Sequence, residues 1–228
     1  MKLSFSNRGW KDLTWDELLS TAGEMRFGGI ELHDPQKQRD FMGRGGPFHK
    51  YAISATVRNL RERRLAIPCL DSSCDLSVES AGTVETLRDL FALASDLRVP
   101  CVCAWASRDA EATVRANIAE LLPEAARRQV TLLVKTCGVY ADTARLRDLL
   151  NSFARDELAV LWDMHHTYRD HGESAARTIE NLGAYVRHVH LRDSDDATTY
   201  NLIGEGTLPV KEMMEALSSI NYDGFISL

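Results

Sequence analysis

The sequence has no apolar stretch of the length that a membrane crossing needs. Its longest apolar run, near residues 99–106, is far shorter than the roughly 20 residues of a spanning helix. No apolar segment of signal-peptide length precedes the first charged residues at the N-terminus. The five cysteines are an odd number and none forms a Cys-x-x-Cys pair, a usage typical of reduced thiols. These absences predict a cytoplasmic protein with no membrane partner.

An excess of positive charge is also absent. The chain has 27 Lys and Arg against 33 Asp and Glu, a formal charge of −6. Because nucleic acids attract basic surfaces, we expect no nucleic-acid partner. The 228 residues suffice for one sizeable core, and no linker, repeat or low-complexity segment divides them. We therefore expect a single domain over residues 1–228.

Short apolar or β-branched runs alternate with longer amphipathic runs along the whole chain. The predicted strands are 2–7, 29–33, 66–71, 99–105, 130–136, 159–164, 186–191 and 224–228, and the predicted helices are 14–25, 51–63, 84–95, 110–128, 143–153, 175–182 and 209–220. Such alternation predicts parallel strands covered by helices. No glycine-rich phosphate loop follows the first strand, which argues against a dinucleotide-binding fold. We therefore predict an α/β protein with a closed (β/α)₈ TIM barrel.

The last predicted strand reaches Leu228, so the sequence contains no eighth helix. A barrel without this helix would expose apolar strand surface between its first and last βα units. We expect either a chain that has been cut after the strand or a homo-oligomer in which another subunit covers the seam.

Polar and ionisable residues follow nearly every predicted strand. In TIM barrels, the chemistry lies at the carboxyl ends of the strands. The residues at these ends are Asn7, Glu31, His33, Asp71, Ser72, Trp105, Ser107, Lys135, Asp163, His166, His188, His190, Arg192 and Asp193. Because side chains alternate along a strand, Glu31 and His33 share the inward face, as do His188 and His190.

Two of these patterns suit a metal. Asp163 and His166 form an Asp-x-x-His motif, and carboxylate plus imidazole are suitable ligands for a divalent ion; the alternative is a pair of ordinary loop residues. His188 and His190 add two imidazoles on one inward face, or they are hydrogen-bonded core residues.

A resemblance to a known family rests on several segments. Residues 161–166 (LWDMHH), 188–193 (HVHLRD), 203–206 (IGEG) and 28–32 (GGIEL) resemble the sugar phosphate isomerase/epimerase family of xylose-isomerase-like TIM barrels, to which the abasic-site endonucleases are related. The resemblance implies a sugar or cyclitol substrate and one divalent metal (Mn, Co, Zn or Mg), bound by a Glu, an Asp, a His and a second Glu.

Within this resemblance, Asp163 matches the aspartate ligand and His190 the histidine ligand, while His166 matches a residue that contacts a substrate oxygen. The family's chemistry is metal-assisted proton transfer next to a carbonyl. The endonuclease branch also needs an Asp-x-His shortly before the IGEG segment, where this chain has TTYNL. The sequence therefore favours the sugar branch over DNA repair.

The chain departs from the family at Lys135, which stands where the first glutamate ligand is expected, and the second glutamate would follow Leu228. A protonated lysine cannot ligate a metal and repels it. We expect Lys135 to take the place of the metal and to pair with Asp163; the alternative is a solvated lysine at the barrel mouth. Metal-assisted isomerisation should then be impaired.

The remaining site residues have less specific roles. Lys135, His166 and Glu31 are the catalytic candidates, and the substrate-binding candidates are His33, Trp105, His188 and Arg192. Glu31 and His33 could instead satisfy each other, and Trp105 could simply pack. Residues 193–196 (DSDD) are interpreted as a solvated acidic loop. Three functions stay open: an isomerase-like enzyme, a non-catalytic barrel that binds a sugar-like ligand or a protein, and an aldolase-type enzyme with Lys135 as Schiff-base nucleophile.

Overall fold

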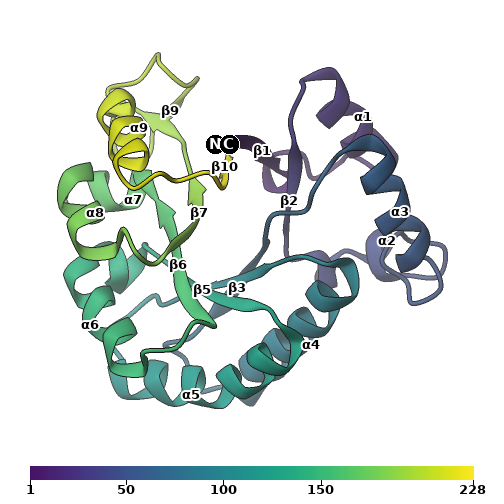
Figure 1. The fold of residues 1–228 in the computed structure, drawn as a ribbon, viewed down its shortest axis with the longest axis horizontal. Helices are drawn as coiled ribbons and strands as arrows, with labels where there is room; N and C mark the ends of the chain where they lie inside the picture. Colours follow the sequence, from purple (N-terminus) through teal and green to yellow (C-terminus); the bar gives the residue numbers. More distant parts are fainter.

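The computed structural model describes residues 1–228 and contains a closed barrel of eight parallel strands (Figure 1). The strands are β1 (Lys2–Ser6), β2 (Gly29–His33), β3 (Leu70–Asp75), β4 (Cys101–Trp105), β5 (Thr131–Lys135), β6 (Leu158–Asp163), β7 (Val186–His190) and β10 (Phe225–Ser227). Around the barrel they follow the order β1-β10-β7-β6-β5-β4-β3-β2. The predicted (β/α)₈ architecture is confirmed.

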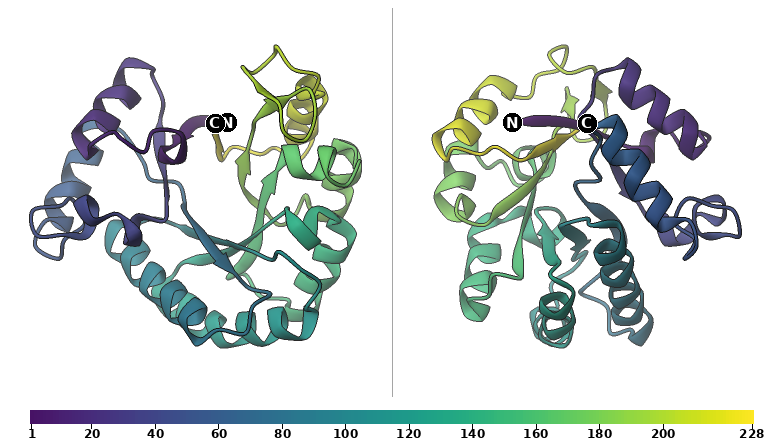
Figure 2. Two further views of the ribbon diagram at one scale, coloured as in Figure 1. Left: turned by 180° about the vertical axis from the view of Figure 1, so that it is seen from behind. Right: turned by 45° about the vertical axis from the view of Figure 1, so that its right-hand side comes forward.

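Helices cover the outside of the barrel except at the β1–β10 seam, as the two views of Figure 2 show. They are α1 (Trp15–Glu24), α2 (Arg39–Met42), α3 (Ile53–Arg63), α4 (Ala81–Leu97), α5 (Glu111–Arg128), α6 (Thr143–Phe153), α7 (Met164–Arg169), α8 (Ala175–Leu182) and α9 (Val210–Ser219). Short 3₁₀ turns lie at η1 (Asn7–Gly9), η2 (Pro35–Lys37) and η3 (Gly138–Ala141), and β8 (Asp193–Ser194) pairs with β9 (Tyr200–Asn201) in a small hairpin. None of the helices combines the length and apolarity that a bilayer crossing requires.

Two strands begin two or more residues later than the sequence pattern predicts. The third was expected over 66–71 but covers Leu70–Asp75, and the fourth was expected from 99 but begins at Cys101. Pro100 immediately precedes the fourth strand, and Pro68 lies two residues before the start of the third. Because proline has no amide hydrogen, it cannot donate to a ladder, and regular pairing resumes after it.

The segment after Asp163 was expected to be a loop but forms the short helix α7. The carboxylate of Asp163 accepts a hydrogen bond from the backbone N–H of His166 at 3.3 Å. A side-chain oxygen at this position satisfies one of the free amides of the first turn. The Asp-x-x-His spacing is therefore also a helix N-cap.

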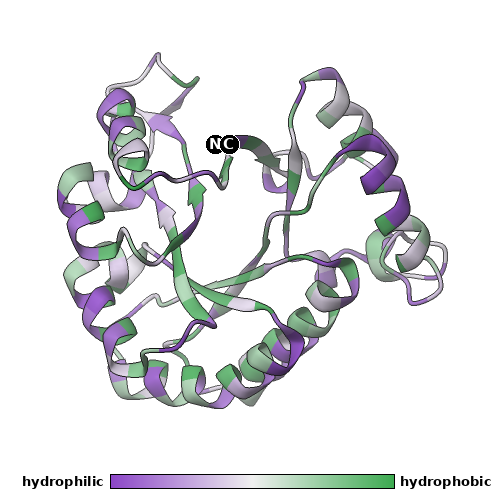
Figure 3. Cartoon of the chain, viewed as in Figure 1, coloured by the Kyte–Doolittle hydropathy of each residue, from purple (hydrophilic) through white to green (hydrophobic).

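The core consists of two parts. The larger is a cluster of 48 buried residues that includes Phe91, Trp162 and Ile30; apolar colouring runs along the strands and the inner sides of the helices in Figure 3. The smaller cluster contains Cys69, Cys101, Cys103, Leu133, Ala159 and Leu161. All five cysteines are unpaired.

The seam of the barrel lies where β1 pairs with β10. Because the two strands are parallel, the N-terminus and the C-terminus lie at opposite ends of this seam, as the right-hand view of Figure 2 shows. Lys2, Leu3 and Ser4 pair with Phe225, Ile226 and Ser227. Leu3 is 48% exposed. The outer side of this seam therefore carries uncovered apolar surface.

Candidate active site at the mouth of the barrel

A cavity of about 730 Å³ opens at the carboxyl ends of the strands. Seven predicted site residues line it: His33, Trp105, Lys135, Asp163, His166, His190 and Arg192. The other two, Glu31 and His188, lie below it and are buried. Strand ends thus bring together residues that are up to 159 positions apart in the sequence.

Lys135 pairs with Asp71, so the predicted pair between Lys135 and Asp163 is wrong. Lys135 Nζ lies 2.7 Å from Asp71 Oδ1, and both side chains are buried. Burial opposes the ionisation of Asp71, but the charge of Lys135 and a hydrogen bond from His33 outweigh it and lower the pKa of Asp71 to about 2. Burial also opposes protonation of Lys135, and the Asp71 carboxylate still raises the pKa of Lys135 above its ordinary value.

Asp163 pairs with Arg192 instead. Arg192 Nη2 lies 3.2 Å from Asp163 Oδ1 and 2.9 Å from Oδ2. Burial raises the pKa of Asp163, but the interactions with His190 and Arg192 prevail, and the pKa stays well below the ordinary value. Arg192 lies two residues after the end of β7 and reaches this carboxylate at the end of the neighbouring β6.

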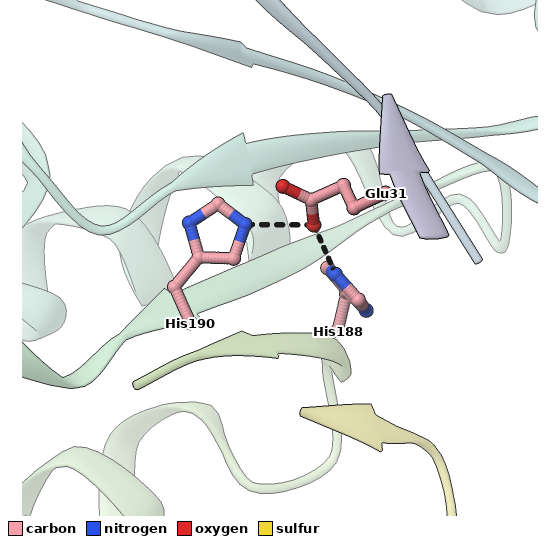
Figure 4. Close-up of side chains that lie close together, drawn as sticks. All are labelled: Glu31, His188 and His190. Carbon is pink, nitrogen blue, oxygen red and sulfur yellow. Dashed lines mark hydrogen bonds and ion pairs between the residues drawn. The ribbon is translucent and has the colours of Figure 1, made fainter. Parts of the chain in front are cut away.

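Glu31 lies beneath the mouth between two histidines (Figure 4). Glu31 Oε2 is hydrogen-bonded to His188 Nε2 and, at 2.8 Å, to His190 Nε2. His188 Nε2 also lies 3.1 Å from Ser227 Oγ. Burial lowers the pKa of His190, but the charge of Glu31 outweighs this effect and raises the pKa to about 9. Glu31 therefore orients both rings from below.

Two half-buried histidines line the mouth, each beside a carboxylate. His33 Nδ1 lies 3.1 Å from Asp71 Oδ2, and His166 Nδ1 lies 2.6 Å from Asp170 Oδ2. Their side chains are 20% and 27% exposed. His33 ends β2 and His166 follows β6, and these strands are four places apart in the ring of eight. The two imidazoles thus enter the cavity from opposite walls.

Sequence reasoning missed the partners of these histidines. Asp71 was noted only as a strand-end residue, and its roles toward Lys135 and His33 depend on contacts between separate strands. Asp170 carried a usable signal, because an acidic residue four positions after His166 lies on the same side of a helix. The alternative that Glu31 and His33 satisfy each other is wrong, since Glu31 bonds to His188 and His190.

The donor set does not fit the metal that the family implies. Asp163 Oδ2 and His190 Nδ1 face each other at 3.7 Å, as two ligands of one ion could. However, the strand end where the resemblance places the first glutamate ligand carries Lys135, and its ammonium offers no lone pair to a metal. Both oxygens of Asp163 already accept from Arg192, so a cation would have to displace one guanidinium and approach another positive charge.

The predicted solvated loop at 193–196 is wrong for its first two residues, because Asp193 and Ser194 are buried. Asp193 is buried, and its carboxylate accepts hydrogen bonds from the backbone amides of Ser194, Gly204, Gly206 and Leu208 at 2.8–3.2 Å. These bonds fold residues 193–208 onto themselves beside Arg192. A buried carboxylate that accepts several backbone hydrogen bonds holds a loop in one conformation, whereas a solvated carboxylate does not.

Solved structures of other proteins have a similar fold. Among solved structures, the probable 3-DHS dehydratase AsbF of petrobactin synthesis from Bacillus anthracis is 17% identical with a TM-score of 0.86, over 100% of this chain and 92% of that one. The IolI protein with a bound zinc atom is 14% identical with a TM-score of 0.79, over 100% and 88%. At these identities, the likeness concerns the fold.

A curated relative matches over a short segment. Fructoselysine 3-epimerase from Escherichia coli O157:H7 is 35% identical over 51 residues, which are 22% of this chain and 18% of that protein. The chain thus matches less than a fifth of that relative's length. A family model described as "Xylose isomerase-like TIM barrel" matches residues 17–228. The chain therefore belongs to the xylose isomerase-like TIM barrel family of sugar isomerase- and epimerase-like proteins.

Proposed function

We propose that the barrel mouth binds a small sugar-like hydroxy-carbonyl compound and transfers a proton next to its carbonyl without a divalent metal. The observation that carries this proposal is the placement of His33 and His166 on opposite walls of a cavity that also contains the Lys135 ammonium. Proton transfer needs a base and an acid at the reacting carbon and a positive charge at its oxygen.

Lys135 supplies the positive charge in this proposal. Its ammonium is held by Asp71 and is already buried, so little reorganisation is needed when negative charge develops on a substrate oxygen. The raised pKa of Lys135 keeps it protonated. The same raised pKa argues against the Schiff-base alternative, because an amine nucleophile must first lose its proton.

The two histidines carry the proton. A neutral imidazole removes the proton from the carbon next to the carbonyl, and the C–H electron pair forms a carbon–carbon double bond while the carbonyl electrons move to oxygen. The second histidine, as imidazolium, returns a proton to the opposite face of that carbon, which inverts its configuration. Asp71 and Asp170 orient the two rings.

The other predicted residues bind or position. Trp105 lines the cavity and offers a flat apolar surface to a sugar ring. Arg192 presents donors to substrate oxygens while it holds Asp163. Glu31 and His188 support His190 from below. Glu31 and His188 therefore act on the substrate only through His190.

A non-catalytic sugar-binding barrel is the second candidate, because Lys135 and Arg192 replace the metal arrangement with paired charges. Proton exchange separates the two candidates. We would incubate the protein with D-fructose in D₂O and EDTA and follow deuterium incorporation beside the carbonyl by NMR, with His33→Asn and His166→Asn as variants. Exchange that falls about 100-fold or more in either variant supports catalysis. Saturable binding without exchange would favour the binding protein.

A further inference from the structure

A second, larger cavity adjoins the mouth. It measures about 980 Å³ and lies between the segment after β1 and the segment after β2, with α3 along one wall. In Figure 1 this is the side of the barrel that carries α1, α2 and α3. Arg8 and His33 line both cavities. A ligand bound at the mouth could therefore extend past these two residues into the side cavity.

The passage between the two cavities is held by polar contacts. Asn7 Oδ1 accepts a hydrogen bond from the backbone N–H of His33 at 2.7 Å, and Gln38 Nε2 donates to the His33 carbonyl at 2.9 Å. The side cavity also has an aromatic base. Trp15 and Phe41 line it, and their ring centroids lie 6.1 Å apart in an edge-to-face arrangement. The floor of the side cavity is thus formed by aromatic rings that pack against each other.

Charges of both signs line the side cavity without partners. The basic residues are Arg8, Lys11 and Arg39, and the acidic ones are Asp12, Asp16 and Asp40. No ion pair or side-chain hydrogen bond involves any of these six charged groups, whereas Lys37 and Asp34 on the same wall pair at 3.0 Å. The mouth differs, because Lys135 and Arg192 are each bound to a carboxylate.

We infer that the substrate is a sugar-like head that bears a zwitterionic amino-acid tail, with the head at the mouth and the tail in the side cavity. This inference rests on the proposed function for the position of the head. Free guanidinium and ammonium groups bind a carboxylate, and free carboxylates bind an ammonium. A purely anionic tail would face three unpaired acids, so the mixed lining favours a tail with both charges.

Binding can test the inference directly. The probes are D-fructose, its conjugate with glycine through C1, and D-fructose 6-phosphate, each titrated by calorimetry in EDTA. We expect the glycine conjugate to bind at least tenfold more tightly than D-fructose. Lys11→Ala and Asp40→Asn should each weaken the conjugate about tenfold and leave the affinity for D-fructose unchanged. Arg44→Ala is the control, because Arg44 is exposed in the same segment but does not line the cavity.

The outcomes separate the two proposals. Equal affinities for D-fructose and its conjugate, or variants that leave the conjugate unaffected, overturn the inference while the proposed function stands. Tighter binding of the phosphate ester than of the conjugate also overturns it, since the cavity would then be an anion site. If none of the three probes binds, the proposed function fails first and the inference fails with it.

Discussion

The ammonium of Lys135 lies 2.7 Å from a carboxylate oxygen of Asp71, and neither side chain has appreciable contact with solvent. The pair joins β5 to β3 across the interior of the barrel, with β4 between them. The second carboxylate oxygen of Asp71 is hydrogen-bonded to His33 Nδ1. One buried carboxylate thus organises both the fixed cation of the site and one of its two histidines.

Removal of Lys135 should destabilise the fold. In Lys135→Met the Asp71 carboxylate stays buried without its cation, and the free energy of unfolding should fall by about 3–5 kcal/mol. In the double variant Lys135→Met/Asp71→Asn the loss should be smaller than the sum of the two single losses, because no unpaired charge remains. Urea unfolding of the four proteins measures this coupling. Additive losses would show that the pair is not coupled.

Stability should depend on pH through Asp71. Its pKa is about 2 in the folded protein, against an ordinary value of 3.8. A lowered pKa contributes stability above the unfolded value that is lost as the pH falls toward the folded value. We expect the free energy of unfolding to drop by about 2 kcal/mol between pH 5 and pH 2 on account of this group. Asp71→Asn should show a correspondingly shallower decline in urea titrations across this range.

Divalent metal should not stabilise the unmodified protein, because Lys135 and Arg192 oppose it electrostatically. In Lys135→Glu, a carboxylate would face Asp71 at the former ion pair, so this variant should be less stable in EDTA. Mn²⁺ should raise its melting temperature, since a cation can now neutralise the two carboxylates. Lys135→Gln is the control and should respond less. A clear rise in the melting temperature of the unmodified protein with Mn²⁺ would contradict this account of Lys135.

The exposed outer side of the seam should mediate self-association. Leu3 is 48% exposed on β1, directly beside β10, and Met1 and Leu228 are also exposed at the two ends of this seam. Exposed apolar side chains of this kind favour contact with another chain. We predict that sedimentation over a concentration series shows a dimer or larger species and that Leu3→Asn shifts it toward the monomer. Leu202→Asn changes an even more exposed leucine in the segment after β9 and should have no effect. A concentration-independent monomer would refute this prediction.

The sequence by itself determined the architecture. Alternation of short apolar runs with amphipathic helices requires parallel strands inside a helical layer, because each apolar face must be buried. The polar strand ends then locate the mouth, since all parallel strands present their carboxyl ends on one side. Strand parity also placed Glu31 and His190 on a shared interior, where they form a hydrogen bond. These inferences need only local periodicity and the direction of the chain.

Only the tertiary structure decided which charges pair. Lys135 lies on a strand adjacent to the strand of Asp163, so neighbourhood in the chain favoured that partner. Arg192 instead neutralises Asp163, and Lys135 reaches Asp71 two strands away. The closure and stagger of the barrel set which inward side chains meet, and no periodic pattern records those distances. The side cavity could not be predicted for the same reason, because its walls come from two loops that follow different strands.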